Sequence, residues 1–242
     1  EGGFVGGERQ GQGRMTYKDG AVYEGAFMGD ARAGKGSFRA ADGYAYTGDW
    51  VAGRMEGMGK LTYADGAVYE GAFKADLPEG RGKITYRDGS GYEGTWVAGR
   101  IEGKGRASYA DGAVYDGAFV NGEATGQGVL TRPDGYRYEG VWTAGKRTGK
   151  GRATYPDGSS YAGDFVDGVR QGTGEFIGFT KSPLMFQTSA SKKDAESFGL
   201  MPPASASIKF GRPAKLCRND NQGFIKHFFR FEIKSKSSKC LV

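Results

Sequence analysis

Apolar and polar residues alternate along two short segments that flank an Asp-Gly dipeptide, and this unit recurs along most of the chain. In its first clear copy the segments read GQGRMTY (residues 11–17) and AVYEGAF (residues 21–27), on either side of Asp19 and Gly20. Period-two alternation is typical of a β-strand with one buried face, and Asp-Gly between two such runs is typical of a hairpin turn. Each unit therefore predicts one β-hairpin.

The unit repeats at a constant interval of 23 residues. Its markers are tyrosines that open a Tyr-x-Gly-x-aromatic string, namely Tyr23, Tyr46, Tyr69, Tyr92, Tyr115, Tyr138 and Tyr161. The strings close on alternating Phe and Trp, namely Phe27, Trp50, Phe73, Trp96, Phe119, Trp142 and Phe165. A fixed period of this length is the signature of a repeat architecture. We predict that these rings form an aromatic ladder with a structural role and a role in interactions.

The register of each hairpin follows from parity, because residues directly opposite each other in an antiparallel pair point to the same face. A two-residue loop would scatter the apolar side chains over both faces. A three-residue loop with Gly20 in the left-handed conformation pairs Tyr17 with Ala21 and Met15 with Tyr23, which gathers the large apolar side chains on one face. We therefore predict the three-residue loop.

Glycine in the middle of a strand needs a reason such as the close approach of another group. Gly13 and Gly25 would leave a patch without side chains between Tyr23 and Phe27, where rings can lie flat. Successive hairpins would then pair edge to edge into an elongated, single-layer antiparallel sheet, with about 9.6 Å gained per repeat. The predicted fold class is all-β, with an irregular basic C-terminal tail.

Charge separates this array from the tail. The chain carries 34 Lys+Arg and 28 Asp+Glu, a net charge of +6. Residues 177–242 hold 12 cationic and 4 acidic residues, a net of +8, so residues 1–176 carry a net of −2. We predict three regions: the array at 1–176, with about seven repeats of which the first is truncated; a Ser/Ala/Lys/Pro-rich linker at 177–207; and a basic, Phe-rich tail at 208–242.

Three hypotheses fit the last region. Alternation around Phe229 and Phe231 indicates a strand that caps the last hairpin. The alternative is an interfacial segment that contacts an anionic lipid surface. The residues of that candidate contact are Phe224, Lys226, Phe228, Phe229, Arg230, Phe231, Lys234, Lys236 and Lys239. The abrupt change in composition also fits an out-of-frame ending.

The motif Gly-x-Gly followed by Asp-Gly-x-x-Tyr-x-Gly-x-Phe/Trp, as in GKGRASYADGAVYDGAF (residues 103–119), resembles the MORN (membrane occupation and recognition nexus) repeat. The resemblance covers residues 1 to about 176. At Ala40 and Arg132, where other repeats have Tyr, we expect a small loss of local packing that leaves the pattern intact. It implies an elongated β array, frequently dimeric, found in scaffolds of cilia, flagella and cytoskeletons, in junctional membrane proteins and beside lipid kinase domains. In that family the repeats are not catalytic.

The residues themselves offer no catalytic, metal or cofactor site in the array. Gly-x-Gly recurs in every unit without the third glycine and helix of a nucleotide site. The sole histidine, His227, and both cysteines, Cys217 and Cys240, lie in the tail, which favours a reduced compartment. Carboxylates fall on the face opposite the rings, as a solvated face or as a recognition strip; they are Glu24, Glu70, Glu93, Asp116 and Glu139. No apolar run reaches the roughly 18 residues of a membrane span.

We therefore expect a non-enzymatic scaffold or adaptor rod, cytoplasmic and associated with the cytoskeleton or a membrane. Its expected partners are other proteins, including a second copy of itself, and an anionic membrane surface, but not nucleic acid. The alternative is the targeting or regulatory arm of a larger enzyme such as a phosphatidylinositol phosphate kinase, or a phospholipid-binding module acting through the basic tail. The chain opens inside a repeat and without methionine, so we expect a fragment of a longer protein.

Overall fold

The computed structural model describes residues 1–178 and 183–188, which form 17 strands in one sheet. The strands are β1 (Gly2–Val5), β2 (Glu8–Thr16), β3 (Val22–Met28), β4 (Ala31–Arg39), β5 (Ala45–Val51), β6 (Arg54–Thr62), β7 (Val68–Lys74), β8 (Leu77–Thr85), β9 (Gly91–Val97), β10 (Arg100–Ser108), β11 (Val114–Val120), β12 (Glu123–Thr131), β13 (Arg137–Thr143), β14 (Lys146–Thr154), β15 (Ser160–Val166), β16 (Val169–Ile177) and β17 (Pro183–Thr188).

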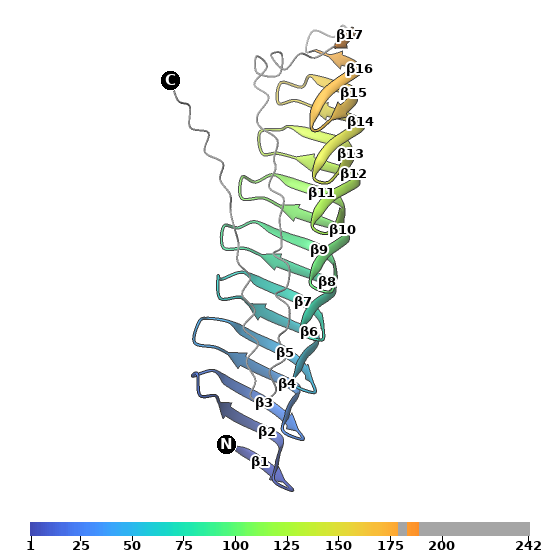
Figure 1. The fold of residues 1–242 in the computed structure, drawn as a ribbon. Coiled ribbons are helices and arrows are strands. Elements are labelled where there is room, and N and C mark those ends of the chain that lie inside the picture. The colour runs from blue at the N-terminus through green and yellow to red at the C-terminus, as the bar shows by residue number, and fades with distance from the viewer. Residues whose placement is uncertain (179–182, 189–242) are drawn as a thin grey trace, which may run out of the picture.

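Each strand pairs antiparallel with the next one along the chain, from β1–β2 to β16–β17. The result is an open, elongated ribbon of hairpins (Figure 1). The predicted all-β repeat sheet is thereby confirmed. One detail differs: β17 lies inside the range 177–207 that we predicted to be a linker, and it pairs with β16. This pairing covers the edge that β16 would otherwise expose.

The Asp-Gly turns have the predicted register. Met15 lies opposite Tyr23 and Gly11 opposite Phe27. The amide of Tyr17 donates to the carbonyl of Ala21 at 2.8 Å, and Gly20 has a φ of 85°. The Asp19 carboxylate also accepts a hydrogen bond from the amide of Ala21 at 3.0 Å. Asp therefore closes the loop with its side chain, and Gly supplies the left-handed residue.

The connections between repeats are tighter than the Asp-Gly loops. In the first, Met28 pairs with Ala31, and both intervening residues, Gly29 and Asp30, have positive φ. This is the two-residue hairpin turn whose twist matches that of the flanking strands. Beyond it the register shifts between Gly25 and Ala26, and Gly34 lies in the bulge with a φ of 56°. The first glycine of each Gly-x-Gly motif is thus a bulge residue, which sequence parity did not reveal.

The second glycine of the motif makes room for a tyrosine ring. The ring of Tyr23 lies over Gly25 of its own strand and Gly36 of the following one, where a Cβ on Gly25 would come within 2.6 Å of the Tyr23 hydroxyl. Gly13, which we expected to share this slot, instead faces the ring edge of Phe27. The glycine slot therefore spans two neighbouring repeats and not one hairpin, because the ring reaches across the inter-repeat pairing.

The rings form a continuous ladder of edge-to-face contacts. Tyr69, for example, contacts Phe73 of its own strand and Trp96 of the next repeat, with centroids 5.0 and 5.2 Å apart. Its hydroxyl donates to the carbonyl of Ala72 at 3.0 Å, and the indole N–H of Trp96 donates to the carbonyl of Gly82 at 3.2 Å. Edge-to-face pairs stabilise beyond the area that they bury. The polar tips are satisfied, so the rings can be buried in a sheet one layer thick.

Two departures from the motif are compensated across the Asp-Gly turn. Ala40 and Arg132 stand where other repeats have Tyr, and the residues opposite them are Tyr44 and Tyr136 in place of Ala or Ser. Tyr44 packs on Phe38 with ring centroids 6.2 Å apart. The ring has moved to the partner strand on the same face. The expectation that these positions merely lose packing was therefore wrong.

The predictions for the last part of the chain concern residues outside the described ones. They concern the candidate lipid contact from Phe224 to Lys239, the single histidine and the two cysteines. The same holds for the tail at 208–242, so these stay predictions.

Candidate interaction surface

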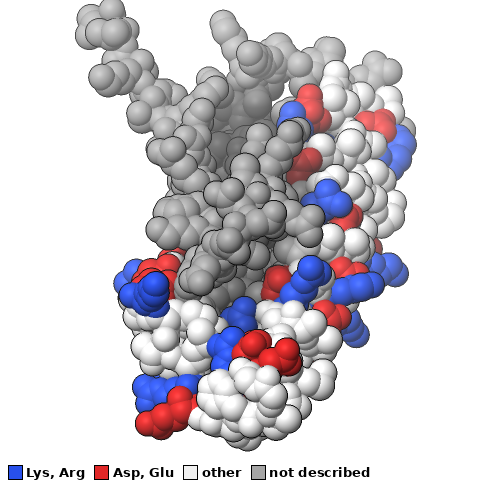
Figure 2. All heavy atoms as spheres, turned by 60° about the horizontal axis from the view of Figure 1, so that its bottom comes forward, with Lys and Arg blue, Asp and Glu red and all other residues white. Residues whose placement is uncertain are grey.

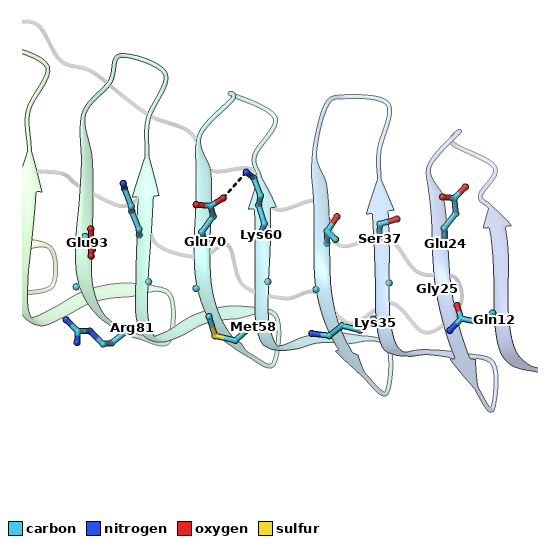
Figure 3. A pocket seen from close by; sticks show the side chains of 18 of the residues that line it. Gln12, Glu24, Gly25, Lys35, Ser37, Met58, Lys60, Glu70, Arg81 and Glu93 are labelled. Atoms are coloured by element: carbon cyan, nitrogen blue, oxygen red, sulfur yellow. Dashed lines mark ion pairs between the residues drawn. The ribbon is translucent and has the colours of Figure 1, made fainter.

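A groove runs along the polar face, crossing the strands of the first four repeats. Its lining comes from two rows of side chains with a line of glycines between them (Figure 3). One row includes Glu24, Lys60 and Glu70, and the other includes Lys35 and Arg81. The groove encloses about 1120 Å³. It forms because the residues on either side of each glycine point to the polar face, whereas the glycine position itself faces the tyrosine rings.

Three of the five predicted carboxylates, Glu24, Glu70 and Asp116, make cross-strand ion pairs, whereas Glu139 pairs with Arg137 of its own strand. Lys60 contacts Glu70 at 2.8 Å, and Arg106 contacts Asp116 at 3.3 Å. The hydrogen bond from Lys60 holds the pKa of the Glu70 carboxyl below its ordinary value. Both partners of each pair are largely exposed, so each contributes little net stability. Cationic and acidic side chains accordingly lie intermixed on the surface shown in Figure 2.

A second segment of the groove follows the later repeats, from Gln127 to Glu175. It is floored by the equivalent glycines, including Gly140 and Gly163, and encloses about 880 Å³. Because the lining positions recur with the repeat, a partner that contacts one hairpin meets a related surface on the next. The individual side chains differ, so each hairpin presents its own variant of the same arrangement.

A row of exposed apolar side chains accompanies the groove and was missed by sequence reasoning. It occupies the last residue of the strand before each two-residue turn: Val5, Met28, Val51, Val97, Val120 and Val166. Between 43% and 70% of each residue is exposed, with Lys74 and Thr143 filling the remaining two positions. The signal was present in the sequence as an apolar residue directly after six of the eight closing aromatics. We call these six residues the apolar row.

The aromatic ladder lies on the other face and is buried. Tyr69 and Tyr138 are fully inaccessible, and Trp142, among the most exposed of its rings, is 7% exposed. Burial raises the pKa of Tyr92 to about 12. Their burial is what the predicted structural role of these rings requires. Their contact with a partner stays a prediction, since little of their surface is accessible.

The described residues hold no group of three or more His, Cys, Asp and Glu side chains arranged to bind a metal ion. Within residues 1–178 and 183–188, no helix is long and apolar enough to cross a membrane.

Solved structures with a related arrangement are distant. The SAS-4 (dCPAP) TCP domain of Drosophila melanogaster, in complex with a proline-rich motif of Ana2 (dSTIL), is 11% identical with a TM-score of 0.41, over 73% of this chain and 90% of that one. A variant of the TCP10 domain of Danio rerio CPAP is 18% identical with a TM-score of 0.35, over 73% and 88%. No curated protein sequence matches the chain significantly.

The family comparison is direct. The MORN repeat matches eight consecutive segments: residues 1–22, 23–43, 46–68, 69–91, 92–114, 115–135, 138–160 and 161–180. These segments cover most of the chain and coincide with the run of hairpins from β1 to β16. The chain therefore belongs to the MORN repeat family.

Proposed function

We propose that this protein is a non-enzymatic scaffold rod that binds other proteins, including a second copy of itself, and tethers them to the cytoskeleton or to a membrane. The observation that carries the proposal is the apolar row. Large apolar side chains in contiguous exposed sets mark interaction surfaces in soluble proteins. Here they occupy six of the eight equivalent positions along the array, at the last strand residue before each two-residue turn.

The energetics favour contact along several hairpins at once. Burial of apolar surface contributes roughly 25 cal/mol per Å², so one valine adds little and a row of them adds several kcal/mol before the cost of association is subtracted. Val51 and Val120 are held in strands whose backbone groups pair on both sides, which fixes their spacing. A partner therefore meets anchors whose positions are already ordered.

The array itself offers a natural control. Lys74 occupies an apolar-row position in the middle of the array, so the fold accommodates Lys there. The test substitutes Val97→Lys and Val120→Lys together in the full chain. Thr85→Lys and Thr131→Lys form the matched control, because both are exposed strand residues near the Asp-Gly turns and add the same charge.

The first readout is mass by light scattering, and the second is the set of proteins captured from lysate, quantified against wild type. We expect the apolar-row variant to lose self-association and a defined subset of captured proteins, while the control keeps both. Equal behaviour of the two variants, with circular dichroism unchanged, would contradict the proposal.

A further inference from the structure

Four arginines are the second residue of their strand, and three of them make the same two contacts. Each guanidinium carbon lies 4.0–5.9 Å from the centre of the closing aromatic ring of its own hairpin. Each guanidinium also donates, at 2.7–2.9 Å, to an oxygen atom of the residue three positions after that ring. The three sets are Arg9 with Phe27 and the Asp30 carboxylate, Arg32 with Trp50 and the Gly53 carbonyl, and Arg147 with Phe165 and the Gly168 carbonyl. The array therefore shows three times how such an arginine binds an aromatic residue followed by an oxygen acceptor.

The fourth arginine, Arg170 of β16, belongs to a hairpin that lacks the aromatic residue. Thr188 of β17 pairs with Gly172, whereas in the preceding hairpin Phe165 pairs with Gly149. Threonine is smaller than phenylalanine and has no ring for a guanidinium to cover. The oxygen acceptor would follow three residues later, outside the described residues. Within the described part of the chain, Arg170 therefore has neither the ring nor the acceptor.

The surroundings of Arg170 otherwise match those of the internal copies. Its guanidinium carbon lies 5.4 Å from the centre of the Tyr161 ring and 5.9 Å from that of Phe176. The side chain is half-buried, yet it makes no hydrogen bond or ion pair with another described residue. Among those residues Tyr161 has one edge-to-face partner, Phe165, whereas Tyr138 has two. The last rung of the ladder thus presents an aromatic surface beside a guanidinium.

The acids nearest to Arg170 in the sequence are engaged elsewhere. Asp164 and Asp167 pair with lysines at 2.9 and 3.0 Å. Glu175 lines the groove on the opposite face of the sheet. A hydrogen bond between a guanidinium and a carboxylate is about twice as strong as one between neutral groups. Of the two acceptors seen in the internal copies, the carboxylate therefore suits Arg170 better than a backbone carbonyl.

We infer that this end of the ladder binds a segment of a partner protein in which an aromatic residue is followed, three positions later, by aspartate. The ring packs against Tyr161 under the guanidinium of Arg170, and the carboxylate accepts its N–H groups. Such a segment reproduces the contacts of Phe27 and Asp30 with Arg9. The inference rests on the proposed protein-binding function and adds a second contact, on the face opposite to the apolar row, together with the chemistry of the partner.

The probe is a fluorescein-labelled, C-terminally amidated peptide with the sequence of residues 25–30, Gly-Ala-Phe-Met-Gly-Asp. It is titrated with the full chain by fluorescence anisotropy at low salt. One reference peptide has Ala in place of Phe, and the other has Asn in place of Asp. These references test the ring and the carboxylate separately.

The key variant is Arg170→Met, and the matched control is Arg32→Met. Both remove a guanidinium from the same position of a hairpin, so any cost to folding is shared. They differ in that Arg32 already holds a ring and an acceptor of its own chain. A further variant, Thr188→Trp, gives Arg170 a ring from its own hairpin, in competition with that of the peptide.

We expect Arg170→Met to weaken binding of the probe about tenfold and Arg32→Met less than about twofold. Thr188→Trp should weaken it about fivefold. Equal affinities of the three peptides overturn the inference. So does equal binding by the Arg170→Met and Arg32→Met variants, since Arg170 would then be satisfied within the chain, as Arg32 is. The Val97→Lys and Val120→Lys substitutions should leave binding of the probe unchanged, so failure of the proposed function is distinguished from failure here.

Discussion

The end hairpins and the central hairpins of the array cover the aromatic ladder with different kinds of side chain. The position compared lies directly opposite the closing aromatic, after the two-residue turn. From the N-terminal end it is occupied by Arg9, Arg32, Met55, Pro78, Ile101, Ala124, Arg147 and Arg170. Arginine therefore covers the rings at both ends, and apolar residues cover them in the middle.

The arginines lie flat on the ladder while their charged ends stay partly in water. The guanidinium carbon of Arg32 is 4.0 Å from the centre of the Trp50 ring, and its Nη2 donates to the carbonyl of Gly53 at 2.9 Å. Arg147 repeats the arrangement over Tyr138 and donates to the carbonyl of Gly168 at 2.7 Å. An arginine stem covers apolar surface, and its planar group interacts favourably with ring faces.

The central residues are instead removed from solvent. Ile101 is fully inaccessible, and Met55 and Ala124 are at most 7% exposed. A charge there would lose its hydration without gaining a partner. The difference shows that one repeat motif does not imply one environment: apolar side chains cover the rings in the central hairpins, and arginine stems cover them towards both ends.

Placing arginine in the centre should break the pattern most severely. Ile101→Arg buries an unpaired charge between the rings, and we expect a loss of about 4 kcal/mol in the free energy of unfolding. Urea denaturation of the full chain measures it, with amide exchange locating the damage at β9–β11. The surface substitution Arg100→Ile, one residue away, serves as the control. A loss below about 1 kcal/mol for Ile101→Arg would mean that the central position is wetter than described.

Filling a central glycine slot should cost nearly as much. A Cβ on Gly71 would lie 2.6 Å from the Cα of Gly82 and 2.8 Å from the carbonyl oxygen of Arg81, which are backbone atoms that cannot move aside. We expect Gly71→Ala to destabilise by about 3 kcal/mol. Gly126→Ala is the comparison, because its Cβ meets no atom within 4 Å and only the positive φ opposes it. The melting temperature of Gly71→Ala should lie clearly below that of Gly126→Ala. Equal melting temperatures would contradict the close packing at Gly71.

Removing a displaced tyrosine should cost less, and restoring it should recover the loss. Tyr44→Ala takes away the ring that replaces the absent Tyr at Ala40, at a cost of about 2 kcal/mol. The double change Ala40→Tyr with Tyr44→Ala recreates the arrangement of Tyr17 and Ala21, and should return most of that stability. The double-mutant cycle in urea measures the coupling. Additive effects of the two changes would show that the rings do not substitute for each other.

Exchanging arginine for an apolar residue at the end should have a small effect. Arg32→Met copies Met55, the residue of the next repeat, and gives up the Trp50 contact and the bond to Gly53. We expect a loss of about 1 kcal/mol, visible as faster amide exchange in β3–β5. A loss as large as that of Ile101→Arg would erase the distinction between the end and the centre.

Alkali should leave neutral stability untouched and act only at high pH. Burial raises the pKa of Tyr92 and Tyr138 to about 12, from an ordinary value of 10.0. Below pH 10 these tyrosines are protonated in both states. Between pH 10 and 12 the unfolded chain loses protons that the folded chain keeps, so the free energy of unfolding falls as pH rises. Tyrosinate absorbance during unfolding at several pH values measures this; a decline beginning well below pH 10 would implicate other groups.

Much of the fold could be predicted because its determinants are local. The Asp19-Gly20 turn, the register that pairs Met15 with Tyr23, and the period of 23 all depend on residues within one hairpin. Turn chemistry and side-chain parity act over that distance, and the repetition of the motif tests each inference several times. The role of Ala40 was misjudged although the compensating Tyr44 stood four residues away, because it was read within its own strand only.

The sequence by itself determined the hairpin, its repetition and the face on which the rings gather, since each follows from neighbours along the chain. Only the tertiary structure decided how one hairpin meets the next: the bulge at Gly34, the seat of Tyr23 over Gly36, and the exposure of the apolar row. These depend on register between strands of different repeats. A shift in that register changes which side chains are neighbours, but it leaves the sequence motif of each repeat unchanged.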